Sequence, residues 1–278
     1  MSTIGKQHMK IGIKDAQGKK VGETNLPQQF NEEMRPDLVR RAFLVIRGHD
    51  RQPYGADPEA GMRTSAKISR RRRKYKGSYG LGISRVPRKI MSRRGTRFNW
   101  VGAFAPGMVG GRRAHPPKAE KKWTHKLNKK ERKKAIRSAL ASAMNSAAVA
   151  SRGHEVPAEY PFAFEAKAEQ LGKTKEVISM LEAAGLAAEM SRTRSAKIRA
   201  GKGKTRGRKY RIKKGPLIVV SGDCPLLRAV ANIRGVEATL ASSLNCRLLA
   251  PGGDPGRLTI FTEAAIEKMQ KEKLYMEK

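Results

Sequence analysis

Acidic residues are absent from two long segments of this 278-residue sequence, residues 61–119 and 190–222. Both segments are rich in Lys and Arg, so each carries positive charge that nothing within it neutralises. Self-repulsion opposes the collapse of such a segment into a core of its own. Over the whole chain 60 Lys and Arg stand against 24 Asp and Glu, a formal net charge of +36. We therefore expect a strongly anionic partner.

Cysteine is scarce. Cys224 and Cys246 are the two cysteines and lie far apart, which excludes a disulfide framework and a four-thiolate zinc site. We expect both to be free, partly buried thiols. The five histidines are scattered without the pair spacing of a metal site, so we expect neither metal nor cofactor. Carboxylates are missing where the polar glycine-rich loops occur, so no catalytic constellation is visible and we do not expect an enzyme.

Long hydrophobic runs are also missing. Purely apolar runs are short, such as residues 217–220, and none is long enough for a membrane span. The N-terminus passes quickly from Ser2, Thr3 and Ile4 to charged residues and lacks the apolar centre of a signal peptide. We expect a cytoplasmic protein with no membrane partner.

Segments with the apolar pattern of a β-strand alternate along the chain with segments that have the apolar spacing of an α-helix. Strands are predicted at residues 10–14, resuming at 21 after a turn, and at 162–166, 216–220, 236–240 and 257–261. Helices are predicted at residues 36–48, 128–151, 173–184 and 223–235, and from 262 onward. Strands that alternate with helices indicate an α/β fold, a three-layer body with a mainly parallel sheet covered by helices.

Local signals set the predicted helix ends. Asn128 and Glu131 have the spacing of a capping box, and Gly185 is placed to end the helix over 173–184. Lys129 and Lys130 lie in the first turn of the helix over 128–151, which is unfavourable for the helix dipole. Either a nearby anion compensates these charges or solvent screens them.

Loss of periodicity marks the domain boundaries. Residues 50–61 collect Pro53, Gly55 and Pro58, and regular structure returns near residue 128. We therefore predict a globular body made of residues 1–49 and 123–278, with a basic insertion at about 190–215, and an extended loop over residues 50–122. The apolar faces lie outside the loop, so the body is expected to fold without it.

A nucleic-acid backbone is the polyanion that best fits the two acid-free segments, because neutralising phosphates with Lys and Arg releases condensed counterions. Glycines let the backbone approach phosphates closely. The candidate RNA-binding residues of the loop are Arg63, Arg70, Arg71, Arg72, Arg73, Lys74, Lys76, Arg85, Arg88, Lys89, Arg93, Arg94, Arg97, Arg112, Arg113, His115 and Lys118. Those of the second segment are Lys197, Arg199, Lys202, Lys204, Arg206, Arg208, Lys209 and Arg211.

Aromatic residues are set among these charges. Tyr79, Phe98 and Trp100 either stack on unpaired bases or form a small cluster that braces the loop. His115 has two readings as well, a hydrogen bond to phosphate or base, or a solvated loop position. Both pairs of alternatives stay open at the level of sequence.

Gly203-Lys204-Thr205 is similar to the end of a nucleotide phosphate-binding loop, but the match is incomplete. That loop needs a glycine where Ile198 stands, and it follows a buried strand. A clamp on the RNA backbone explains the same residues without catalysis. Two alternative functions are a nucleotide-using enzyme at this loop and a DNA-compacting protein or general nucleic-acid chaperone.

Several strings taken together resemble the universal large-ribosomal-subunit protein four family, and most of all its archaeal branch. They are Arg35-Pro36-Asp37-Leu38, Ala60-Gly61, Arg63-Thr64-Ser65-Ala66, Gly110-Gly111-Arg112-Arg113-Ala114-His115-Pro116-Pro117-Lys118, Arg199-Ala200-Gly201-Lys202-Gly203-Lys204, Gly207-Arg208-Lys209-Tyr210, Leu249-Ala250-Pro251-Gly252-Gly253 and Gly256-Arg257-Leu258-Thr259-Ile260-Phe261-Thr262-Glu263.

This resemblance implies a structural constituent of the large ribosomal subunit that supports subunit assembly and translation. It implies three kinds of partner: large-subunit ribosomal RNA, neighbouring large-subunit proteins and the nascent peptide. In this family a long internal loop threads through ribosomal RNA and its tip lines part of the peptide exit tunnel. By position, the tip corresponds to Gly82, Ser84, Arg85, Val86, Pro87 and Arg88.

Overall fold

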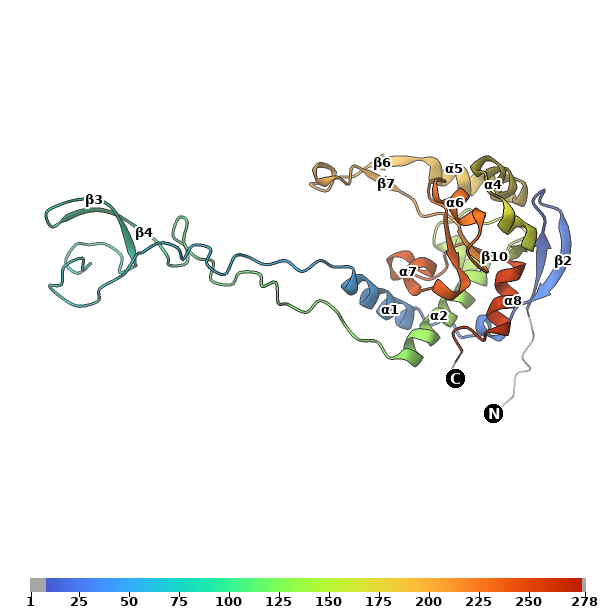
Figure 1. Ribbon diagram of the computed structural model, residues 1–278, viewed down its shortest axis with the longest axis horizontal. Helices are drawn as coiled ribbons and strands as arrows, with labels where there is room; N and C mark the ends of the chain where they lie inside the picture. Colours follow the sequence, from blue (N-terminus) through green and yellow to red (C-terminus); the bar gives the residue numbers. More distant parts are fainter. Residues whose placement is uncertain (1–8, 277–278) are drawn as a thin grey trace. The chain divides into compact units, whose positions relative to one another are not determined.

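The computed structural model describes residues 9–276 of the chain. Residues 1–8, on which the expectation about a signal peptide rests, and residues 277–278 lie outside the described part. The chain divides into two compact units (Figure 1), Met1–His49 together with Thr124–Lys278, and Asp50–Trp123. We call the first unit the body and the second the arm.

A six-stranded sheet forms the middle of the body. Its strand order is β2 (Lys20–Asn25), β1 (Lys10–Lys14), β5 (Phe162–Phe164), β10 (Thr259–Thr262), β8 (Leu217–Val220) and β9 (Glu237–Leu240). The β1–β2 hairpin is antiparallel, and every other described pair in this sheet is parallel. The predicted α/β class with a mainly parallel sheet is confirmed.

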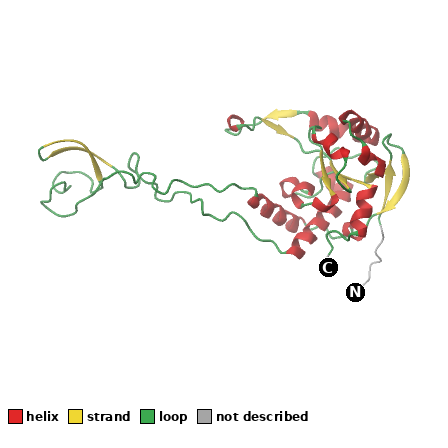
Figure 2. Ribbon diagram, viewed as in Figure 1, coloured by secondary structure: helices red, strands yellow, loops and turns green. Residues whose placement is uncertain are grey.

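Helices cover both faces of this sheet (Figure 2). One face packs against α1 (Pro36–His49), α2 (Lys129–Met144), α7 (Cys246–Leu249) and α8 (Glu263–Lys271). The other packs against α3 (Ser146–Ser151), α4 (Thr174–Leu181) and α6 (Pro225–Ala231). Side chains alternate along β8, so Leu217 and Val219 join the first apolar cluster while Ile218 and Val220 join the second. A strand that is buried on both faces explains the continuous apolar run in the sequence.

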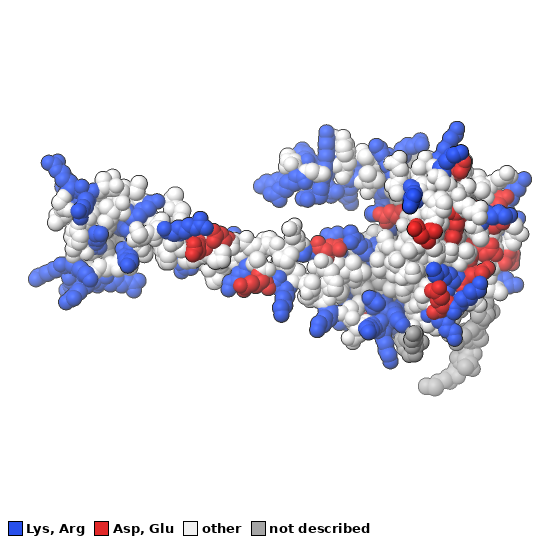
Figure 3. All heavy atoms as spheres, viewed as in Figure 1, with Lys and Arg blue, Asp and Glu red and all other residues white. Residues whose placement is uncertain are grey.

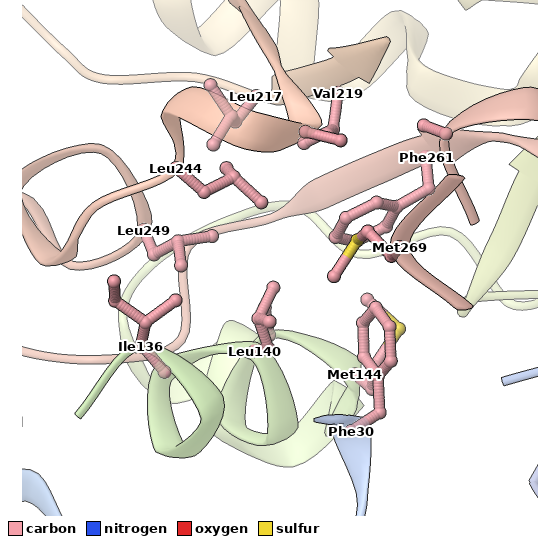
Figure 4. Close-up of a cluster of buried hydrophobic side chains, with 14 of the residues drawn as sticks. Phe30, Ile136, Leu140, Met144, Leu217, Val219, Leu244, Leu249, Phe261 and Met269 are labelled. Carbon is pink, nitrogen blue, oxygen red and sulfur yellow. The ribbon is translucent and has the colours of Figure 1, made fainter. Parts of the chain in front are cut away.

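The first cluster is built largely from α2 (Figure 4). Ile136, Leu140 and Met144 lie at helical spacing on the face of α2 that points toward the sheet. Phe30 and Phe261 meet edge to face, with ring centroids 5.2 Å apart. Both contribute large apolar area to the centre of the body.

Two predictions about helix ends are wrong. The helix expected over residues 128–151 is broken at Asn145, whose side-chain oxygen accepts from the Ala147 and Ala148 amides and starts α3. The capping box does not form, because the Asn128 side chain makes no capping bond and the Glu131 carboxylate pairs with Arg41 at 2.9 Å. Glu131 itself lies in the basic first turn of α2, so this ion pair brings a further cation, Arg41, beside that turn.

The prediction that Gly185 ends the helix over 173–184 is confirmed. Gly185 has φ of 90° and ψ of 14°, a left-handed backbone that lies outside helical geometry and separates two helices at a kink. A further helix, α5 (Ala187–Arg194), follows this kink and leads to the strands of the second basic segment.

Deletion of the arm is expected to leave the body folded, because neither apolar cluster contains an arm residue. A short Gly-Ser linker in place of residues 50–123 joins ends that already lie together, since His49 Nε2 donates to the His125 carbonyl at 3.0 Å. Thermal unfolding of this variant should remain one cooperative transition. As a control, adding Leu140→Ala should lower its free energy of unfolding by about 2–5 kcal/mol. A broad, non-cooperative transition in the armless body contradicts the prediction.

Candidate nucleic-acid interface

The outgoing and returning chains of the arm lie against each other near its base. The rings of Tyr54 and Trp123 stack with centroids 6.0 Å apart. The Arg51 guanidinium lies 3.5 Å from the centroid of the Trp123 ring, a cation–π contact. The Ala56 amide donates to the Pro117 carbonyl at 2.9 Å. We call this paired region, residues 50–62 and 111–123, the stalk.

Two glycines allow the stalk to close. A Cβ atom on Gly55 would lie 2.4 Å from the Ala119 amide nitrogen. At Gly61, where φ is 75°, it would lie 2.4 Å from the Arg112 amide nitrogen. Any side chain at these positions would force the two chains apart. The arm therefore has internal order that its charge alone does not predict.

Beyond the stalk the arm forms a hairpin of β3 (Arg88–Arg94) and β4 (Arg97–Gly102). The rings of Phe98 and Trp100 are tilted by 32° with centroids 5.2 Å apart, and Phe98 meets Tyr75 edge to face at 5.3 Å. Of the two alternatives for these aromatics, the structure gives Phe98 and Trp100 the role of a bracing cluster. Tyr79 instead carries the Arg85 guanidinium over its ring, at 4.5 Å from the centroid.

The residues assigned to the tunnel tip form the loop that leads into β3. Ser84 and Arg85 are exposed, whereas Arg88 is half-buried and donates to the Ser84 carbonyl at 3.0 Å. The Arg88 guanidinium also lies 5.8 Å from the Trp100 centroid. Arg88 therefore braces the loop, and Arg85 is the arginine of this pair that presents more charge outward.

The structure leaves most of the candidate RNA-binding side chains exposed. Four are half-buried: Arg88, Lys89, Arg112 and Arg199. Arg63 is exposed but pairs with the carboxylates of Asp57 and Glu59, so it is partly neutralised within the arm. Most of the other candidate residues of the arm lie beyond the stalk, apart from the acidic residues that the stalk contains (Figure 3).

The second basic segment projects from the body as a two-stranded hairpin (Figure 1) of β6 (Ala196–Ile198) and β7 (Tyr210–Ile212). The Arg199 amide donates to the Lys209 carbonyl at 2.8 Å and extends the ladder toward the tip. The tip holds a short 3₁₀ turn (Lys204–Arg206) closed by Gly207, whose φ is 77°. We call residues 196–212 the basic ribbon.

The position of Gly203-Lys204-Thr205 in this exposed tip differs from that of a nucleotide phosphate-binding loop. Such a loop connects a buried strand to a helix. Here the preceding strand is β6, all of whose residues are exposed, and the connection returns to β7. The Thr205 hydroxyl donates to the Lys202 carbonyl at 2.8 Å, which closes the turn on itself.

A buried carboxylate fixes the root of the basic ribbon, and no sequence pattern had singled it out. Glu189 on α5 is fully buried and accepts from His154 Nδ1 at 2.7 Å, from the Glu155 amide at 3.0 Å and from Arg192 Nε and Nη2 at 2.6 Å. Arg192 also donates to the Lys214 carbonyl at 2.8 Å, just beyond the ribbon. The chain that enters the ribbon and the chain that leaves it are thereby tied together.

These hydrogen bonds set the charge state of Glu189. Burial acts to raise the pKa of this carboxyl, but the bonds from Arg192, His154 and the Glu155 amide outweigh burial, and the pKa lies below its ordinary value of 4.5. The i,i+3 spacing of Glu189 and Arg192 was readable in the sequence. The part played by His154, 35 residues away, was not.

Arg257 provides a second tie between the ribbon and the sheet. Its side chain is fully buried, and Nε donates to the Gly215 carbonyl at 2.9 Å while Nη1 donates to Glu237 at 2.7 Å. Burial lowers the pKa of this guanidinium to about 10, which leaves it charged at neutral pH. Glu237 also accepts from Lys214, the same residue whose carbonyl binds Arg192.

Within residues 9–276, no group of three or more His, Cys, Asp or Glu side chains is placed to hold a metal ion. No helix in this described part is long and apolar enough to cross a membrane.

An α/β body with two basic extensions defines a class of protein, one that binds polyanions through its extensions rather than in a cleft. Comparison with known families places the chain more narrowly. The model of the Ribosomal protein L4/L1 family matches residues 24–272. The chain therefore belongs to the Ribosomal protein L4/L1 family, a family of ribosomal proteins and not of enzymes.

The chain is similar to several archaeal proteins named large ribosomal subunit protein uL4. It is 48% identical over 268 residues to that of Nanoarchaeum equitans, covering 96% of this chain and 100% of the relative. Identity is 44% over 259 residues for Methanococcoides burtonii, covering 93% and 96%. For Archaeoglobus fulgidus it is 41% over 260 residues, covering 93% and 97%. These relatives confirm the family resemblance read from the sequence and its archaeal character.

Glu189→Gln is expected to destabilise the body by roughly 2–4 kcal/mol at neutral pH, because it leaves Arg192 half-buried without its carboxylate. The folded-state pKa of Glu189 is lowered, so its stabilisation is full above the unfolded pKa and is lost as pH falls through the folded value. Between about pH 5 and about pH 3, the free energy of unfolding should therefore fall less steeply in Glu189→Gln than in the parent. Urea unfolding across this range measures both effects.

The matched control is Glu182→Gln on the exposed side of the neighbouring turn, where the same chemical change removes no buried bond. Parallel pH profiles for the parent and Glu189→Gln would show that the carboxylate does not lock the root of the ribbon.

Proposed function

We propose that this chain is a structural constituent of the large ribosomal subunit, in the cytoplasm, and that it binds large-subunit ribosomal RNA through the arm and the basic ribbon. The observation that carries the proposal is charge placement. The arm from residue 61 to residue 119 and the basic ribbon carry positive charge that no carboxylate within them neutralises, and most of their cations are exposed. The family and the names of the relatives supply the kind of polyanion.

The salt dependence of RNA binding tests the role of the basic ribbon. The variant Lys202→Ala, Lys204→Ala, Arg206→Ala removes three exposed tip cations. It should bind large-subunit ribosomal RNA fragments more weakly and reduce the magnitude of the slope of log K against log salt by about two to three. Filter binding or fluorescence titration at several salt concentrations gives the slope.

The control removes the same charge from the body, through Lys167→Ala, Lys173→Ala, Lys175→Ala. These lysines are exposed on the body, and two of them pair with Glu165 and Glu176. An equal loss of slope in both triple variants would mean that net charge, and not the ribbon, drives binding. Duplex DNA added as competitor at fixed salt separates the alternative of a DNA-compacting protein, which would bind both polymers equally.

For the arm we propose that residues 82–88 line part of the peptide exit tunnel and contact the nascent peptide. The assignment rests on the family resemblance, with Arg85 as the outward charge. Neighbouring large-subunit proteins and ribosomal RNA are the other proposed partners, and support of subunit assembly is the proposed role of these contacts.

Arg85→Glu is expected to change peptide-dependent stalling in ribosomes that contain the variant chain, because it reverses an exposed charge at the tunnel wall. Thermal unfolding of the free variant should match the parent, since Arg85 packs only on Tyr79 within the arm. Arg70→Glu makes the same charge change on an exposed arm residue outside the tip and should not alter stalling. Normal stalling with Arg85→Glu would remove this loop from the tunnel wall.

A further inference from the structure

The two faces of the basic ribbon differ completely in chemistry. Directly paired residues of an antiparallel ladder present their side chains on the same face. Ala196 pairs with Ile212 and Ile198 pairs with Tyr210, so these four apolar side chains share one face. Lys197 pairs with Arg211 on the opposite face. The ribbon is therefore amphipathic, apolar on one side and cationic on the other.

The apolar face is uncovered in the folded chain. Ile198 is 65% exposed, Tyr210 is 57% exposed and Ile212 is 45% exposed. A two-stranded ribbon has no second layer of its own to cover such a face. Contiguous exposed apolar side chains of this size mark surfaces that become buried against a partner.

The arm hairpin shows that this segregation is particular to the ribbon. On β3 and β4, Arg93 pairs with Phe98 and Lys89 pairs with Val101, so cations and apolar side chains share faces. Mixed faces suit RNA, where a base and its phosphate are contacted together. At the three paired positions of the ribbon the apolar face holds no cation, although Lys209, just before β7, places its Nζ 5.5 Å from the centroid of the Tyr210 ring.

The side chains themselves favour a protein surface over RNA. Two of them are branched aliphatic isoleucines, which offer a base neither a flat stacking surface nor a hydrogen bond. Isoleucine beside tyrosine is instead suited to the apolar centre of a protein interface. Arg194 and Lys213 flank the two strands in the sequence and are both exposed, so positive charge is available close to this face.

We propose that the basic ribbon is a two-sided connector, whose cationic face binds ribosomal RNA while its apolar face docks on a neighbouring large-subunit protein. The partner surface is apolar and aliphatic at its centre, with carboxylates at its rim that face Arg194 and Lys213. The inference rests on the proposed function and names the protein-binding surface within it. The root fixed by Glu189 and Arg257 holds both faces in a set orientation.

Site-specific photocrosslinking tests the two faces separately. Benzoylphenylalanine replaces Tyr210 in one full-length chain and Arg211 in another, and large subunits that contain each chain are purified and irradiated. The probe at position 210 should crosslink to a large-subunit protein, and the crosslinked peptide should carry aliphatic residues flanked by Asp or Glu. The probe at position 211, one residue away, should crosslink to ribosomal RNA.

The outcomes are distinguishable. Crosslinks to RNA from position 210, or none, together with the same result from a probe at Ile212, would overturn the inference. Proposed RNA binding by the ribbon would still stand if position 211 crosslinks to RNA. If position 211 does not crosslink to RNA, that RNA contact fails, whatever position 210 shows.

Substitutions on the two faces test the same assignment through binding affinities for the protein partner and for RNA. Ile198→Asp should weaken binding to the crosslinked protein about fivefold or more, while its binding to ribosomal RNA fragments stays within about twofold of the parent. Lys197→Asp, on the adjacent residue and opposite face, should do the reverse. Both positions are exposed, and circular dichroism confirms that each variant folds. Loss of RNA binding alone in Ile198→Asp would assign the apolar face to RNA.

Discussion

Repulsion among cations that have no carboxylate nearby is the constraint on which this structure depends. The arm and the basic ribbon contribute no residue to the two apolar clusters of the three-layer body, and most of their cations stay exposed. Exposure of the charge makes phosphate binding favourable, because each phosphate neutralised returns counterions to solution. The same property that keeps these segments out of the core thus suits them to a polyanion.

Two carboxylates lie where they control this charge. The buried Glu189 binds Arg192, the partly exposed Glu237 binds the buried Arg257, and both pairs reach the chain at Lys214 or Gly215, where the basic ribbon rejoins the sheet. A buried ion pair adds little net stability compared with apolar packing, although removal of one partner is strongly destabilising. The contribution of these two ion pairs is to fix the orientation of the basic ribbon relative to the sheet.

The body could be predicted from sequence and the extensions only in part. Runs such as residues 217–220 and the helical spacing of Ile136 and Leu140 report burial directly, and their class and order are confirmed. The hairpins β3–β4 and β6–β7 were not predicted, because β6 and β7 alternate over only three residues each and the sequence of β3 does not alternate. Asn145 ended a helix that looked continuous, because a side chain that caps the next helix has no hydrophobic signature. The contact between His154 and Glu189 depends on tertiary packing, which periodicity does not report.

The glycines of the stalk have a consequence for size. Where Gly55 faces Ala119 and Gly61 faces Arg112, the two chains touch backbone to backbone with no side chain between them. At these levels the two chains approach each other about as closely as the axes of adjacent strands, which are about 5 Å apart. Larger residues at Gly55 and Gly61 would spread the two chains, so these glycines limit the width of the gap in a folded polymer that the stalk needs.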